Sequence, residues 1–136
     1  PGVPPGRTVF CHAGAVAQAH IDAVDRGRVG ENYILPGPQA TYLEFIACAG
    51  RLLGRSTPTR PTPAAVLKAL GLLSLAGSYL TGREPDLTPE GAAVVCGRQS
   101  VVTDKALREL GYSSPPLENM IAESIDWMRR EGRLEP

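Results

Sequence analysis

Residues 103–127 carry the clearest pattern in the chain and read TDKALRELGYSSPPLENMIAESIDW. Ser114-Pro115-Pro116 predicts the start of a final helix. Apolar residues then recur at helical spacing on the expected inner face, namely Leu117, Ile121, Ile125 and Met128. Trp127, on the same helix, is interpreted as a packing residue. Equally informative is an absence: nowhere does the sequence contain a Gly-x-x-Gly-x-x-Gly turn or a Tyr-x-x-x-Lys pair.

The bulk composition fits one soluble globular domain over residues 1–136. Hydrophobic residues make up 43% and charged residues 21% of the chain, and the formal net charge is zero. A neutral chain exerts no overall pull on nucleic acid or an anionic membrane, so we expect neither partner. Three widely spaced cysteines without a Cys-x-x-Cys pair indicate free thiols in a reducing compartment. With no signal sequence at the N-terminus, the expected location is the cytoplasm.

Local signals predict a mainly helical chain with two or three short strands. A strand over 8–12 leads into a helix with apolar positions at 16, 19, 23 and 24, which the glycines at 27 and 30 end. His20 falls on that apolar face and is expected to be buried and hydrogen-bonded. A second strand is predicted over 32–35, before Pro36.

The next two helices have clear start signals. Thr41-x-x-Glu44 is a capping box, and Gly54 suits the position just after that helix. Thr62-Pro63 supplies an N-cap and a first helical residue for a helix that runs to Leu80. This helix is apolar nearly all round. A membrane span is one interpretation, but the run is slightly short and contains a lysine and two glycines, which favours a core or subunit-interface helix.

These pieces, in this order, resemble the extended short-chain dehydrogenase/reductases, the NAD(P)-dependent epimerase, dehydratase and reductase family. The closing segment resembles the family's last two helices, and three earlier stretches resemble its middle. A further stretch is similar to the dihydroflavonol-reductase-like and sugar-epimerase-like branches. The matching stretches are Thr103–Tyr112 with Pro116–Glu118 and Trp127, Phe10–His20, Gly27–Leu35, Thr41 to Arg55, and Thr81–Thr88.

The resemblance implies an α+β fold, mainly helical, that forms the C-terminal substrate-binding portion of a Rossmann-type enzyme. A missing N-terminal half would bind NAD or NADP on a Gly-rich turn and supply the catalytic Tyr and Lys. The parent enzyme would oxidise, reduce or epimerise a hydroxyl or keto carbon of a sugar, sterol-like or flavonoid-like substrate. This chain alone would have no catalytic residues, would bind no cofactor, and would shape the pocket for that small-molecule substrate.

The same resemblance places candidate substrate ligands just before the aromatic-x-His element. By position these are Arg7, Thr8 and Val9, and Arg98 is a second candidate for binding an anion. Nucleotide-sugar members carry a phosphate-binding arginine where this chain has Thr8, so such a substrate is disfavoured. The family's helix-capping aspartate is replaced by Ala15, so that Gly14 would serve as a poorer cap. Because of this replacement, a third hypothesis is kept, namely that the full-length protein is an enzyme relic without catalysis.

Two other kinds of function were weighed. Cys11, His12 and His20 lack the spacing of a zinc site, so no metal site is expected. Adjacent Cys and His residues on a strand point to opposite faces, so no Cys–His nucleophile is expected either.

The rival hypothesis is a free-standing helical interaction module that dimerises through the Ala64–Leu80 helix. A truncated enzyme half should leave Phe10, Val16 and Val24 poorly covered, whereas a native module should bury them.

Overall fold

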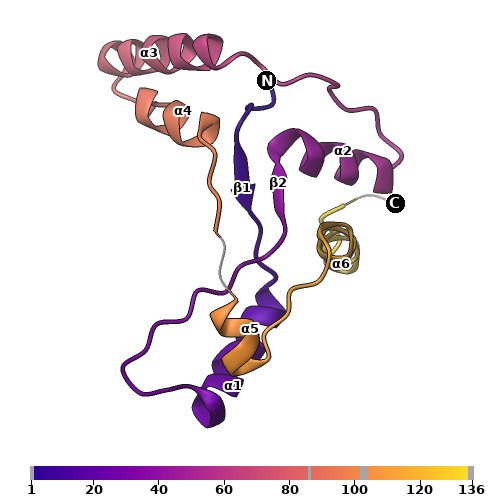
Figure 1. Ribbon diagram of the computed structural model, residues 1–136. Helices are drawn as coiled ribbons and strands as arrows, with labels where there is room; N and C mark the ends of the chain where they lie inside the picture. The colour runs from indigo at the N-terminus through magenta and orange to yellow at the C-terminus, as the bar shows by residue number, and fades with distance from the viewer. Residues whose placement is uncertain (1, 86, 102–103, 135–136) are drawn as a thin grey trace. The chain divides into compact units, whose positions relative to one another are not determined.

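The computed structural model describes residues 2–85, 87–101 and 104–134, which form six helices and two short strands (Figure 1). In chain order the elements are β1 (Arg7–Val9), α1 (Ala13–Arg26), β2 (Gln39–Thr41), α2 (Tyr42–Leu52), α3 (Ala64–Thr81), α4 (Pro89–Cys96), α5 (Lys105–Leu110) and α6 (Leu117–Arg130). Thr103, the first residue of the closing motif, lies outside the described residues. The described part is mostly helical, and its equivalence to the C-terminal portion of a Rossmann-type enzyme stays a prediction.

The contacts divide the chain into two compact units, and the single domain expected from the sequence stays a prediction. Unit 1 comprises residues 1–8 and 41–99, and unit 2 comprises residues 9–40 and 100–136. The strands β1 and β2 form a two-stranded sheet. The Tyr42 N–H donates to the Gly6 carbonyl in unit 1, and the Phe10 N–H donates to the Pro38 carbonyl in unit 2, so the strands run antiparallel.

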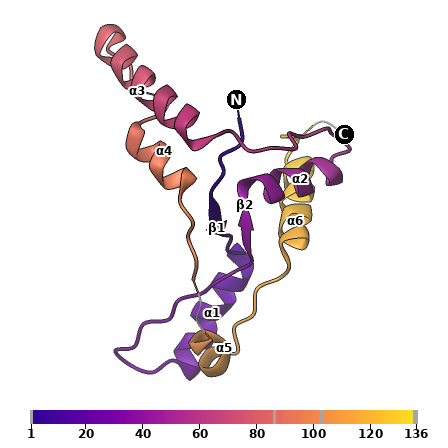
Figure 2. The same cartoon turned by 45° about the horizontal axis from the view of Figure 1, so that its top comes forward.

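Unit 1 is organised by helix caps and one close helix pair. The capping box predicted at Thr41 and Glu44 is confirmed, and Gly54 follows α2 with a φ of +63°. Thr88 caps α4 by accepting the Gly91 N–H, with Pro89 at the first helical position. Helices α3 and α4 pack side by side, as the two views in Figures 1 and 2 show. Gly71 of α3 permits this approach, because a Cβ there would come within 3.0 Å of the Thr88–Pro89 backbone.

Unit 2 is built around α1 and α5. Ala19, Ala106 and Tyr112 are buried together, with Ala15, Tyr33 and Leu35 packed against them. The Arg26 guanidinium donates to the Leu110 carbonyl at 3.1 Å, which satisfies a free carbonyl at the end of α5. Gly111 then turns the chain with a φ of +74°.

A charged network, here called the loop clamp, ties the segment after α1 to α5. Arg28 donates to Glu109 through Nε at 3.1 Å and through Nη2 at 2.7 Å, and the Tyr33 hydroxyl donates to the same carboxylate at 2.7 Å. Lys105 donates to Glu31 at 2.7 Å and lies 4.4 Å from the centre of the Tyr33 ring. The Tyr33 hydroxyl and then Arg28 lower the pKa of Glu109, and Lys105 lowers the pKa of Glu31.

Several expectations about local structure are wrong. Residues 32–35 form no strand, because no other segment in the described part of the chain pairs with them. His20 is exposed, although its ring does bond the Val16 carbonyl at 2.8 Å. The N-cap of α3 is Pro63 rather than Thr62, whose N–H instead donates to the Val3 carbonyl.

One further correction concerns the cap of α1 in unit 2. Helix α1 is capped by His12, not by Gly14, and Ala15 lies inside its first turn, where the cap is not required. Tyr112 is buried, and its hydroxyl has no hydrogen-bond partner among the described residues. This burial raises the pKa of Tyr112.

Candidate functional site

The first candidate site lies in unit 1, where the structure brings together two of the four predicted substrate ligands, Arg7 and Arg98. Arg7 and Arg98 form a parallel bridge: the Arg7 N–H donates to the Gly97 carbonyl at 3.0 Å, and the Gln99 N–H donates to the Arg7 carbonyl at 2.9 Å. Residues directly opposite each other in a strand pair project to the same side. Both arginines are exposed, so two guanidinium groups share one side of this strand pair.

Thr8 and Gln99 alternate with the two arginines and therefore project to the other side. The Thr8 hydroxyl donates to the Gln99 side-chain oxygen at 3.2 Å, which fits this register. Thr8 is thus engaged by a neighbour rather than grouped with the arginines. Val9, the fourth predicted ligand, ends β1 and is half-buried in unit 2.

Glu44 supplies negative charge near Arg7. The Thr41 backbone N–H, at 2.7 Å from a carboxylate oxygen, is the main cause that lowers the pKa of Glu44, and the Thr41 hydroxyl and Arg7 lower it further. The Glu44 carboxylate therefore acts mainly in the capping box of α2. Since like charges placed directly opposite each other repel, the arrangement is best suited to binding an anion between the two guanidinium groups.

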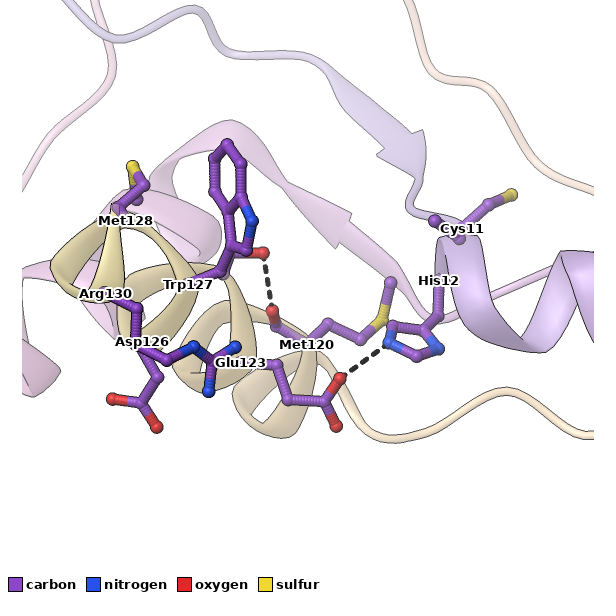
Figure 3. A pocket seen from close by; sticks show the side chains of 10 residues that line it. Cys11, His12, Met120, Glu123, Asp126, Trp127, Met128 and Arg130 are labelled. Atoms are coloured by element: carbon purple, nitrogen blue, oxygen red, sulfur yellow. Dashed lines mark hydrogen bonds and ion pairs between the residues drawn. The ribbon is translucent and has the colours of Figure 1, made fainter. Parts of the chain in front are cut away.

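The second candidate site is a groove of about 650 Å³ in unit 2. It lies between the start of α1 and one side of α6, and Figure 3 shows its lining side chains. We call it the α1–α6 groove. Its lining combines an aromatic ring and two methionines with acidic and basic groups. The lining residues are Cys11, His12, Ala13, Met120, Glu123, Ser124, Asp126, Trp127, Met128 and Arg130.

His12 is the organising residue of the α1–α6 groove. Its Nδ1 accepts the Ala15 N–H at 3.1 Å, so the ring proton of the neutral form belongs on Nε2, which lies 2.8 Å from Glu123 Oε2. Both ring nitrogens are therefore occupied, and neither is left to activate Cys11. The Cys11 thiol donates instead to the Leu35 carbonyl at 3.4 Å, and Figure 3 shows the two side chains directed apart.

Sequence reasoning missed the His12–Glu123 pair. The two residues are 111 positions apart, and neither lies in a recognisable catalytic spacing. The helical pattern of α6 does predict which of its faces is inward, since Ile121 and Ile125 are buried. No local sequence signal predicts which residues α6 contacts. Within the described residues, no group of three or more His, Cys, Asp or Glu side chains could hold a metal ion.

Comparison with known proteins gives two matches that extend along nearly the whole chain, and no protein-family profile matches. The chain is 22% identical over 132 residues, or 96% of its length, to sterol demethylase protein B of Methylococcus capsulatus. It is 29% identical to the crystal structure of gox2253, with a TM-score of 0.73 over 96% of the chain. The chain spans about two fifths of both proteins, 40% of the first and 41% of the second.

Proposed function

We propose that this chain is the substrate-binding part of an NAD(P)-dependent enzyme that acts at a hydroxyl or keto carbon of a sterol-like substrate. The observation that carries the proposal is the Arg7–Arg98 bridge, which places two guanidinium groups on one side of a strand pair. Such a pair suits a carboxylate, because each guanidinium can donate parallel hydrogen bonds to its two oxygens. The preferred substrate is therefore a sterol-like molecule that bears an anionic group.

A family resemblance supports the enzyme class, and the name of one relative supports the sterol-like substrate class. The motifs between Phe10 and Trp127 resemble, in their order, those of the extended short-chain dehydrogenase/reductases, and this resemblance implies that the region shapes the substrate pocket. A protein named for sterol demethylation matches 96% of the chain. Among the sugar, sterol-like and flavonoid-like classes implied by the resemblance, this name favours the sterol-like one.

The exposure of α1 favours an enzyme part over a free-standing interaction module. Val24 is 82% exposed, and Phe10 and Val16 are only half-buried. A native module should cover these positions, whereas a substrate-binding part leaves them for a cofactor-binding half. On this proposal, that half supplies NAD or NADP binding and the catalytic Tyr and Lys, and the 136-residue chain has no turnover of its own.

Binding of cholate, a soluble sterol carboxylate, tests the role of the two arginines. We expect calorimetric titration to show binding that weakens about tenfold or more in Arg7→Gln and in Arg98→Gln, since a hydrogen bond to a charged group contributes about 1.5–3 kcal/mol. Arg55→Gln, which removes the same charge from an exposed position after α2, is the matched control. If cholate bound all three variants with equal affinity, Arg7 and Arg98 would not be part of the binding site.

Two controls test two parts of the proposal separately: that the substrate carries an anionic group, and that the cofactor binds to another half. The uncharged cholate amide should bind wild type as weakly as cholate binds the arginine variants, because it lacks the anion. Titration with NADH and NADPH should give no heat of binding to the isolated chain. Heat in that second titration would contradict the assignment of cofactor binding to another half, whatever the result with cholate.

A further inference from the structure

The two histidines of the chain bond the backbone of α1 in opposite ways. His12 accepts the Ala15 N–H through Nδ1 at 3.1 Å, so this bond exists only while Nδ1 carries no proton. Nδ1 of His20 lies 2.8 Å from the Val16 carbonyl oxygen, and because that oxygen only accepts, Nδ1 of His20 carries a proton. Protonation of a histidine ring leaves a hydrogen on both nitrogens. It therefore breaks the backbone bond of His12 and preserves that of His20.

The His12 ring is held between α1 and α6, both of them in unit 2. Its Nε2 lies 2.8 Å from Glu123 Oε2, as the dashed line in Figure 3 shows. On the α1 side, a Cβ on residue 14 would come within 3.0 Å of the ring atom Cε1, so Gly14 leaves the space that the ring occupies. One edge of the imidazole thus serves α1 and the other serves α6, and a charge on the ring acts on both helices.

The charges around the ring favour α6 over α1 once the ring is protonated. An imidazolium at the N-cap lies at the positive end of the helix dipole, and the first turn of α1 contains no acidic residue to offset it. On the other side, the Glu123 carboxylate attracts the same charge. The other ionisable residues that line the α1–α6 groove are Cys11, Asp126 and Arg130, and Asp126 is already paired with Arg129 at 3.5 Å.

We propose that His12 is a proton-operated cap of α1. The neutral ring closes the first turn of the helix and donates to Glu123. The protonated ring gives up the Ala15 N–H, keeps Glu123, and so opens that first turn. Histidine is the side chain that ordinarily changes its charge between pH 5 and 8, so we expect the cap to respond in this range.

The consequence falls on the α1–α6 groove. Cys11, His12 and Ala13 form the part of its lining that precedes or begins α1, so opening the first turn alters this wall of the groove. The walls contributed by α6 are unaffected, because their helical hydrogen bonds do not involve His12. The proposal is independent of the substrate assigned above, since it depends only on the two bonds of one ring in unit 2.

NMR titration of the 136-residue chain from pH 8 to 5 tests the proposal. The Ala15 amide shift should change in a single transition that has the same midpoint as the ring protons of His12. Over that transition, the protection of the Ala15 amide, corrected for the intrinsic pH dependence of exchange, should fall roughly fivefold, as expected for a cap of about 1 kcal/mol. The amides of residues 19–21 should keep their protection while His20 titrates, which makes them the internal control.

Two variants assign the transition to His12. His12→Asn supplies an acceptor that does not titrate, so its Ala15 amide should keep the same protection from pH 8 to 5. His20→Gln removes the other histidine and should retain the wild-type transition. An Ala15 amide that stays unchanged while His12 titrates, or a transition that persists in His12→Asn, would overturn the proposal. So would a His12 ring that remains neutral down to pH 5, because the cap would then not respond in the proposed range.

Discussion

His12 shows how one side chain can both end a loop and join two distant segments. Its Nδ1 caps α1, and its Nε2 reaches Glu123 on α6, with both residues in unit 2. The cap is local and involves one of the N–H groups that have no partner within the helix. The contact to Glu123 is more exposed, since that side chain keeps 62% of its accessible surface. We therefore expect the cap to contribute most of the stability that His12 provides.

Substituting His12 separates these two roles. His12→Ala loses the cap and the Glu123 contact, and should lower the free energy of unfolding by about 1–2 kcal/mol. His12→Asn keeps a side-chain acceptor for the Ala15 N–H and should recover most of that loss. Glu123→Gln should change the stability by less than about 0.5 kcal/mol. Urea unfolding followed by circular dichroism measures all three, and an Asn variant as unstable as the Ala variant would show that the cap is not the main contribution.

The loop clamp makes the junction between α1 and α5 sensitive to acid. The pKa values of Glu109 and Glu31 lie below the ordinary 4.5 because of their partners Tyr33, Arg28 and Lys105. A carboxylate with a lowered pKa in the folded state stabilises the fold above its unfolded pKa. That stabilisation is lost as the pH falls through the folded-state value. The clamp should therefore be fully effective at neutral pH and fail below about pH 4.5.

The variant Glu109→Gln tests this pH dependence. Its melting temperature should lie below that of wild type at pH 7, and the difference should shrink as the pH is lowered from 5 toward 3, because wild type then loses the same interaction. Glu84→Gln, at an exposed position after α3, is the matched control and should follow wild type throughout. A difference between Glu109→Gln and wild type that stays constant with pH would mean that the carboxylate charge is not what stabilises the clamp.

Elements whose cause is local were predictable from sequence, and those whose cause is distant were not. The capping box at Thr41 and Glu44 follows from residues three positions apart, and the structure confirms it. The bridge between Arg7 and Arg98 joins segments 91 positions apart. The sequence therefore identified each arginine as a candidate substrate ligand, but it could not predict that the two arginines pair. The strand expected over 32–35 fails for the same reason, because apolar composition gives strand propensity and not a pairing partner.

For the molecule as a whole, residues 32–35 are where the proposed enzyme architecture can be tested. Their composition predicts a buried strand, yet Ile34 is 59% exposed and no backbone hydrogen bond from their N–H groups occurs within the described residues. Unpaired strand-forming segments can add to the edge of another sheet. If the proposed cofactor-binding half exists in a longer polypeptide, its sheet would supply the missing partner.

Amide hydrogen exchange distinguishes the two situations. In the 136-residue chain, the amides of residues 32–35 should exchange rapidly, while those of α1 and α5 stay protected, because helical hydrogen bonds already satisfy them. In a longer polypeptide that carries a dinucleotide-binding half, the same amides should become protected by a factor comparable to that of the helices. The α1 amides serve as the internal control in both samples. Rapid exchange at residues 32–35 in both would mean that this segment joins no sheet, which would contradict the proposed pairing with a cofactor-binding half.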